Sequence, residues 1–335
     1  MNYIAGLDIG STKLALVIGK IDRKGTLEIV EFCKGNSEGV RNGVVVDVNR
    51  LTNSILALKE SLRIKRFFSV LISINGREIR SHFTHSALNL SLRGEEIKEW
   101  HLEALKRKGR NISLPLDRKI ICSFPLEYVV DGEEEIINPV RMTGTHIQIR
   151  LHLISSRIGM LENLIKSVNY AGWEVEECVP ISVCAQSALD QYPSALFLDI
   201  GAQTINMGIS TQGVLRFSFC EVYKKEEFSS LMQRIKEKAE ELKYGEVNKI
   251  VLSGGRALEE GMPERVEEAL KMPVEIGISS VRLQKQIAEG EEKEVIENPV
   301  YTVSLGLVKY GVKKRKERRK GRIWTRLRRW IEGYF

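Results

Sequence analysis

A short run near the N-terminus, Asp-Ile-Gly-Ser-Thr-Lys, contains residue types that suit the binding of phosphate groups. Gly10 allows backbone N–H groups to approach an anion closely. The hydroxyls of Ser11 and Thr12 add donors, and Lys13 supplies a positive charge. Asp8 offers a carboxylate for a hydrated Mg²⁺, which prefers oxygen ligands. A tight capped hairpin without a ligand would use the same residues, so this run alone leaves both interpretations open. The Walker A pattern is absent.

A related run occurs 191 residues later: residues 7–19 read LDIGSTKLALVIG, and residues 198–210 read LDIGAQTINMGIS. In both, an apolar strand breaks at Asp-x-Gly, passes through small or hydroxyl residues, and resumes as an alternating apolar strand. This pattern predicts two β-hairpins and therefore a duplicated fold with two related lobes. Asp199, Gly201 and Thr204 of the second run stand where the first run has Asp8, Gly10 and Lys13.

The third candidate is the pair Gly254-Gly255, which ends the apolar strand NKIVLSGG and precedes a helix around Pro263 to Leu270. Paired glycines at a strand-to-helix turn allow a flat ligand or a phosphate to lie against the backbone. A plain turn would need no ligand. Two Asp-Gly hairpins followed by this turn are much more specific than any one of the three.

The elements that must position these residues alternate between strands and helices. Apolar residues recur every three or four positions from Leu51, from Ile158 and from Phe228, which predicts amphipathic helices there. Between Phe68 and about Leu153, the stretches SVLISING, EEIKEWHLEALKRKG, RKIICSFPLEYVV and THIQIRLHLIS predict strand, helix, strand and strand. We therefore expect two α/β lobes with a small α+β insert.

Composition narrows the class of protein. The five cysteines form no C-x-x-C pair, so a disulfide framework or zinc site is not expected and a reducing cytoplasm fits best. No apolar run reaches the roughly 18 residues of a membrane span, and the N-terminus lacks the pattern of a secretory signal.

The net charge of +7 comes from the C-terminus. Residues 313–335 carry eleven Lys or Arg and two Glu, so the remaining 312 residues, with 40 basic and 42 acidic side chains, have a net charge of −2. A protein built around a nucleic-acid groove would carry its positive charge on the folded body. We therefore expect no nucleic-acid partner.

The basic tail also carries an apolar stripe. On a helix, its apolar residues fall within an arc of about 140°, with Arg328 among the polar residues opposite. The apolar set is Ile323, Trp324, Leu327, Trp330, Ile331, Tyr334 and Phe335. This pattern is typical of a helix lying in a membrane interface, and the preceding run KKRKERRKGR adds attraction to anionic lipid of ~1 kcal/mol per residue. A helix docked on the body and a nucleic-acid-binding arm are the alternatives.

Four stretches carry a resemblance to a known family: GLDIGSTKLALVIG, GNSEGVRNGVVVDVNRL, LENLIKSVNYAGWEVEECVPISVCAQSAL and, in the insert, LPLDRKIICSFPLEYVVDGEEEIINPVRMTG. The order of two phosphate hairpins and a Gly-Gly turn resembles the actin, Hsp70 and sugar-kinase superfamily. Within it, the chain resembles FtsA, the actin-like bacterial cell-division protein family. The resemblance covers almost the whole chain, tail included.

The resemblance implies an actin-like (ribonuclease H-like) two-lobed α/β fold with a small α+β insert and a C-terminal amphipathic helix. It places the first lobe (subdomain 1A) at residues 1–67 and 153–193 and an SHS2-like insert (1C) at 68–152. The second lobe (2A) follows at 194–311, and a basic linker with the membrane helix at 312–335.

The resemblance also implies ATP with Mg²⁺ as the cofactor. Asp8 and Asp199 would orient the metal, the two hairpins would hold the phosphates, and Gly254-Gly255 would pass the adenosine. The implied partners are FtsZ, other division proteins, anionic lipid and further copies of the chain in filaments. The implied location is the cytoplasmic face of the membrane at the division site.

The chain departs from the family in two places. The family's second hairpin reads D-I-G-G-G-T-T-D, whereas this chain has Ala202, Gln203 and Asn206. We therefore assign no catalytic residue and expect at most weak ATP hydrolysis. Only 27 residues, Val222 to Asn248, lie before the strand IVLSGG, too few for a separate core. We expect subdomain 2B, which in the family supplies part of the adenine pocket and the FtsZ docking surface, to be missing.

Two other functions stay open. One is a kinase or degenerate ATPase of the same superfamily, which would need a complete second phosphate loop. The other is a specialised membrane-associated paralogue that serves another envelope machine, such as pilus assembly. The amphipathic C-terminus and the insert favour cell division.

Overall fold

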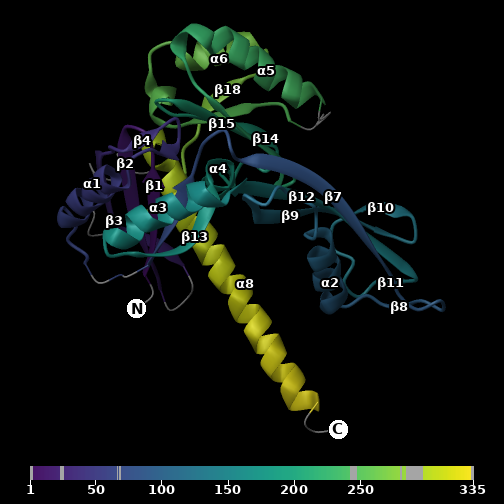
Figure 1. The fold of residues 1–335 in the computed structure, drawn as a ribbon. Helices are drawn as coiled ribbons and strands as arrows, with labels where there is room; N and C mark the ends of the chain where they lie inside the picture. Colours follow the sequence, from purple (N-terminus) through teal and green to yellow (C-terminus); the bar gives the residue numbers. More distant parts are fainter. Residues whose placement is uncertain are drawn as a thin grey trace.

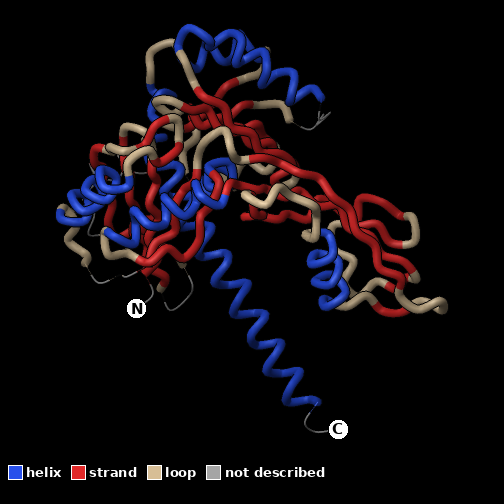
Figure 2. The backbone as a smooth tube through the Cα atoms, in the orientation of Figure 1, coloured by secondary structure: helices blue, strands red, loops and turns tan. Residues whose placement is uncertain are grey.

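The computed structural model describes residues 3–22, 26–65, 67, 69–241, 247–279, 281–283 and 297–332, and from residue 318 it describes the backbone alone. Two sheets with helices on their faces form two lobes, and a further sheet extends to one side as an insert (Figure 1). Figure 2 shows the long C-terminal helix leaving the body. The expected two-lobed α/β architecture with an insert is confirmed.

The first lobe is built on a six-stranded sheet whose strands lie in the order β13 (Glu174–Pro180), β6 (Ser69–Ile74), β1 (Tyr3–Ile9), β2 (Lys13–Ile21), β3 (Leu27–Asn36) and β19 (Arg282–Leu283). Its helices are α1 (Val48–Glu60), α3 (Ile158–Tyr170), α4 (Ile181–Ala188) and α8 (Thr302–Glu332). Gly19 faces α8, whereas Gly35 on the neighbouring strand faces α1. Helices therefore cover both faces, which explains why β2 reads as a continuous apolar run.

The second lobe repeats this plan with the strand order β16 (Val214–Val222), β15 (Thr204–Thr211), β14 (Ala195–Ile200), β17 (Ile250–Ser253) and β18 (Val274–Ile276). Its helices are α5 (Phe228–Glu241) and α6 (Met262–Leu270), with short 3₁₀ turns η1 (Lys225–Glu227), η2 (Gly255–Leu258) and η3 (Pro299–Tyr301). In each lobe an antiparallel hairpin, β1–β2 or β14–β15, pairs with a parallel strand, β6 or β17. The two hairpins and the duplication predicted from the sequence are confirmed.

The insert is a four-stranded sheet in the order β10 (Glu133–Ile136), β9 (Arg118–Val130), β12 (His146–Arg157) and β7 (Arg80–Asn89). It carries helix α2 (Glu99–Gly109) and a small ladder of β8 (Glu95–Glu96) with β11 (Thr143–Gly144). The stretch SVLISING, expected to open the insert, instead forms β6 in the first-lobe sheet, because it pairs parallel with β1. Strand β7, with the sequence RSHFTHSALN, is largely polar and half-exposed.

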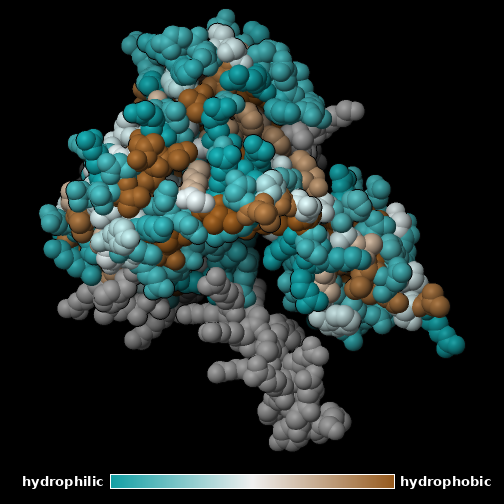
Figure 3. All heavy atoms as spheres, viewed as in Figure 1, coloured by the Kyte–Doolittle hydropathy of each residue, from teal (hydrophilic) through white to brown (hydrophobic). Residues whose placement is uncertain are grey.

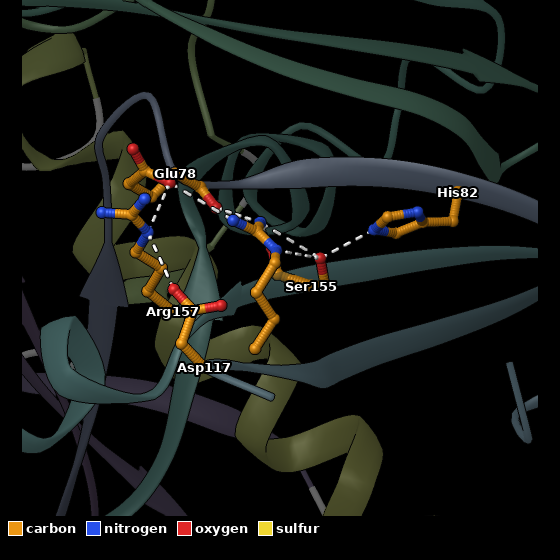
Figure 4. Close-up of polar contacts among 6 residues, drawn as sticks. Glu78, His82, Asp117, Ser155 and Arg157 are labelled. Atoms are coloured by element: carbon orange, nitrogen blue, oxygen red, sulfur yellow. Dashed lines mark hydrogen bonds and ion pairs between the residues drawn. The ribbon is translucent and has the colours of Figure 1, made fainter. Parts of the chain in front are cut away.

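The junction between the insert and the first lobe contains a cluster of charged and polar side chains. Figure 4 shows its labelled members: Glu78, His82, Asp117, Ser155 and Arg157. The buried guanidinium of Arg118 contacts Glu78 Oε2 at 3.2 Å and donates to Ser155 Oγ. Arg157 Nε lies 3.1 Å from the same Glu78 oxygen. These contacts hold the base of the insert where β7, β9 and β12 meet.

The insert also contacts the second lobe through β16. The hydroxyl of Ser81 donates to the Ser218 carbonyl at 2.6 Å and accepts from the Ser218 N–H at 3.1 Å. Phe83 stacks on Phe217, with ring centroids 6.4 Å apart. The insert therefore touches both lobes.

Helix α8 changes two expected boundaries. Its first turns lie in the first-lobe core, where Val303, Leu305 and Leu307 are buried, although residues 194–311 were expected to belong to the second lobe. A linker was expected from residue 312, but the helix is continuous there. The guanidinium of Arg315 donates to the Tyr3 carbonyl at 2.9 Å and pairs with Glu176 at 2.6 Å. The start of the basic run is therefore docked on the body because β1 and β13 supply its partners.

None of the helices in the described ranges combines the length and the apolar character needed to span a bilayer. Figure 3 shows a mostly hydrophilic face of the body, with hydrophobic residues in separate patches.

Candidate functional site

A cavity of about 270 Å³ lies between the two hairpins. All ten residues predicted to bind nucleotide line it: Asp8, Gly10, Ser11, Thr12, Lys13, Asp199, Gly201, Thr204, Gly254 and Gly255. They come from both lobes and lie far apart in the sequence. The structure thus brings together in one cavity the three runs that the sequence singled out.

The two hairpin turns have the same local geometry. Gly10 N–H donates to the Lys13 carbonyl, and Gly201 N–H donates to the Thr204 carbonyl, each at 2.9 Å. A Cβ at Gly10 would lie 2.9 Å from the Lys13 carbonyl oxygen, so the tight turn needs a residue without a side chain there. The repeated turn presents its small and hydroxyl residues to the cavity in both lobes.

Each hairpin also carries a buried carboxylate held by a serine. Ser73 donates to Asp8 Oδ1 at 2.8 Å, and Ser253 donates to Asp199 Oδ2 at 2.9 Å. Burial raises the pKa of Asp8, against the opposing effects of Lys13 and the Ser73 hydrogen bond. Burial, with a further contribution from the negative charge of Asp8, raises the pKa of Asp199 to about 6.

The carboxylates and hydroxyls of this cavity suit a hydrated Mg²⁺ beside phosphates. Mg²⁺ is typically bound by one or two carboxylates, several waters and substrate oxygens rather than by an all-protein cage. The described residues contain no group of three or more His, Cys, Asp or Glu side chains placed to hold a metal by themselves. Lys13 lies close enough to lower the pKa of both Asp8 and Asp199, and its Nζ donates to the Val300 carbonyl at 3.1 Å.

The Gly254-Gly255 turn leaves one side of the cavity open. Gly254 has φ of 87°, a left-handed conformation that favours glycine. A Cβ at Gly255 would meet no atom of the described residues within 4 Å, so this side of the turn can accept a flat group. Beyond it, the guanidinium of Arg256 stacks over the Tyr223 ring at 4.7 Å, and among the described residues the buried Tyr223 hydroxyl has no hydrogen-bond partner.

Sequence reasoning missed two residues of the site. Ser73 is the partner of Asp8, and Asn75 Nδ2 donates to Thr204 Oγ1 at 2.6 Å from the opposite lobe. Both lie at the end of the strand that was expected to open the insert. Its apolar run, followed by Asn-Gly, could have indicated a parallel strand beside β1 whose carboxyl end reaches the cavity.

The predicted membrane residues fall outside the side chains that the structure describes. Residues 323–331 are helical as part of α8, which agrees with the expected helix, but only their backbone is described. These are Ile323, Trp324, Leu327, Arg328, Trp330 and Ile331. Tyr334 and Phe335 lie outside the described residues.

The sequence is similar to bacterial cell division proteins. Residues 76–155 match the family model described as the SHS2 domain inserted in FtsA. The chain is 24% identical to the cell division protein FtsA of Pseudomonas aeruginosa, over 99% of this chain and 98% of that protein. It is 26% identical to FtsA of Borreliella burgdorferi, over 98% of each. The first alignment extends over 418 positions, more than the 335 residues of this chain, so gaps fall within it.

Solved structures show the same fold at low sequence identity. The chain superposes on a type IV pilus biogenesis structure, the PilM-PilN complex, with a TM-score of 0.67 and 15% identity, covering 92% of this chain and 98% of that one. It superposes on the ethanolamine utilization protein EutJ from Carboxydothermus hydrogenoformans with a TM-score of 0.52 and 14% identity, covering 91% and 89%. These likenesses concern the fold alone.

Proposed function

Because the chain belongs to the FtsA family of actin-like bacterial cell-division proteins, we propose that it tethers the FtsZ division ring to the cytoplasmic membrane. In this proposal the two lobes and the insert form the body that binds division partners and further copies of the chain. The C-terminal segment of α8 binds lipid, so the protein acts peripherally at the division site.

The main observation in support of the tether proposal is that α8 is one continuous helix. One helix runs from the first-lobe core, where Val308 is fully buried, into the basic and Trp-containing tail. At ~1.5 Å per residue, the 31 residues of α8 extend over roughly 46 Å. Because the tail is attached through a packed helix, binding of its apolar stripe to lipid would hold the whole body near the membrane.

Vesicle co-sedimentation tests the lipid step by itself. We expect the full-length protein to pellet with vesicles that contain anionic lipid and to bind much less to vesicles of zwitterionic lipid, because the tail carries a charge of +9. A protein truncated after Gly321 should remain folded and lose vesicle binding, since the described core contacts of α8 end before that residue. Equal binding by the truncated protein would exclude residues 322–335 as the lipid anchor.

We propose ATP with Mg²⁺ as the ligand of the cavity between the lobes. The carboxylates of Asp8 and Asp199 would hold the hydrated metal, the hydroxyls of Ser11 and Thr12 and the charge of Lys13 would bind phosphate, and Gly255 would leave room for the adenosine. Bound nucleotide would supply a charged group between the residues of the two lobes that line the cavity, and it would bias self-association. We expect at most weak hydrolysis. Thermal unfolding with and without Mg-ATP tests this, with Asp8→Ala expected to lose the stabilisation by ligand.

The short connection between β16 and β17 supports the proposal that subdomain 2B is missing. Its described residues contain only η1 and the single helix α5. In the family, the lost subdomain carries the docking surface for FtsZ, so this chain must bind FtsZ through another surface. The same feature favours a second candidate, a membrane-associated paralogue that serves another envelope machine. Vesicle binding without FtsZ recruitment would identify that case.

A further inference from the structure

The side chain of Gln203 joins the two lobes at the cavity. Its Oε1 accepts a hydrogen bond from the backbone N–H of Asn42 at 2.7 Å. Gln203 lies in the hairpin turn of the second lobe, whereas Asn42 belongs to the first lobe, in the turn between β4 (Val40–Arg41) and β5 (Val44–Val45). The two residues are 161 positions apart in the sequence.

The turn that contains Asn42 and Gly43 makes close contacts with neighbouring residues of the first lobe. Asn42 and Gly43 both have positive φ, 52° and 75°, as in the tight turns of two-residue hairpins. Gly43 N–H donates to Ser11 Oγ at 3.3 Å, and a Cβ at Gly43 would lie 2.8 Å from the Gly76 nitrogen. The turn that carries the Asn42 N–H is therefore packed closely against Ser11 and Gly76.

A second bridge lies beside the first. Asn75 Nδ2 donates to Thr204 Oγ1 at 2.6 Å, and Asn75 Oδ1 accepts from Gly76 N–H at 2.7 Å, which orients the amide. Asn75, Gln203 and Thr204 all line the cavity between the lobes. The lobes are thus joined by side chains of the chain itself at the place where a ligand would contact both.

Backbone N–H groups beside a cavity are natural donors to an anionic oxygen. Here the neutral amide oxygen of Gln203, whose residue lines the cavity, accepts such an N–H from the neighbouring turn at Asn42. We propose that Gln203 substitutes for a phosphate oxygen: it closes the lobes without a nucleotide, and a phosphate that binds Asn42 N–H must displace it. Gln203 is a positioning residue in this proposal. Its displacement step rests on the nucleotide site proposed above, whereas the closure of the lobes does not depend on nucleotide, lipid or FtsZ.

Amide hydrogen exchange of the protein without nucleotide tests the proposal. Gln203→Met keeps the length of the side chain and removes the acceptor, and Gln233→Met is the matched control on the exposed face of α5. We expect exchange of the Asn42 amide, read from a peptide containing it, to rise about fivefold or more in Gln203→Met, as a net hydrogen bond of about 1 kcal/mol implies. The control should leave it unchanged.

Unchanged exchange in Gln203→Met, or an equal rise in both variants, would overturn the proposal. Gln203→Ala gives the same readout with a smaller side chain, should the methionine be accommodated poorly. The affinity for Mg-ATP should increase in both Gln203 variants because the competing acceptor is gone. An unchanged or lower affinity, or no binding, would contradict the displacement step. The exchange result without nucleotide stands whether or not the tether proposal holds.

Discussion

Asp8 and Asp199 occupy equivalent places in the two lobes, and each carboxylate accepts a hydrogen bond from a serine on the adjacent parallel strand. Ser73 on β6 donates to Asp8 at 2.8 Å, and Ser253 on β17 donates to Asp199 at 2.9 Å. The duplication therefore includes the polar partners behind each hairpin as well as the hairpins themselves. It also places two buried negative charges at one cavity.

The first prediction concerns the pH dependence of stability. Because the pKa of Asp199 is raised from 3.8 to about 6 in the folded protein, its stabilising contribution is present below about pH 4 and is lost as the pH rises through 6. Asp199→Asn removes the buried charge and keeps an acceptor for Ser253. We expect the stability advantage of the variant over wild type, measured as the free energy of unfolding, to increase by on the order of 2 kcal/mol when the pH rises from 4.5 to 7.5.

Urea unfolding at the two pH values measures this difference. The gain should appear at pH 7.5 and largely disappear at pH 4.5, where the wild-type carboxyl is already protonated in the folded state. A gain in stability of the same size at both pH values would show that burial does not raise the pKa of Asp199.

The second prediction compares two arginines that share one carboxylate. Arg118 and Arg157 both contact Glu78, but the side chain of Arg118 is 4% exposed and that of Arg157 is 53% exposed. Removing one partner of a buried pair costs about 3–5 kcal/mol, whereas an exposed pair contributes about 0–1 kcal/mol. Arg118→Met should therefore destabilise the protein strongly, and Arg157→Met should have a small effect in the same urea titration. Similar losses in both variants would refute the assignment of Arg118 as the buried anchor.

The sequence predicted the two hairpins that line the cavity. It did not predict the strand and the helix that pack behind them. Asp-x-Gly followed by alternating apolar residues predicts each hairpin because turn and strand preferences are local. The pairing of β6 with β1 is not local, so Ser73 was assigned to the insert. The placement of Leu305 and Leu307 in the first-lobe core has the same origin, because only tertiary packing decides which sheet an apolar helix face covers.

The third prediction concerns the contact of α8 with α4. A Cβ at Gly306 would collide with the carbonyl of Cys184, so the two helices approach closely only because this residue has no side chain. We expect Gly306→Ala to destabilise the protein by about 1–3 kcal/mol. Gly159, near the start of α3, has no atom within 4 Å of the equivalent position and is the control.

Gly159→Ala should leave stability unchanged or raise it by up to about 1 kcal/mol, because alanine restricts the unfolded chain. Thermal unfolding of both variants measures the contrast. A neutral Gly306→Ala would mean that α8 is held less closely to α4 than the packing indicates, and it would weaken the case for a rigid attachment of the tail.

Vesicle co-sedimentation of FtsZ from the same organism tests most directly the proposal that this protein connects FtsZ to the membrane. Full-length protein should bring FtsZ down with anionic vesicles, and the protein truncated after Gly321 should leave FtsZ in solution. If the full-length protein pellets with the vesicles while FtsZ stays in the supernatant, the tether is contradicted and the chain serves another partner at the membrane.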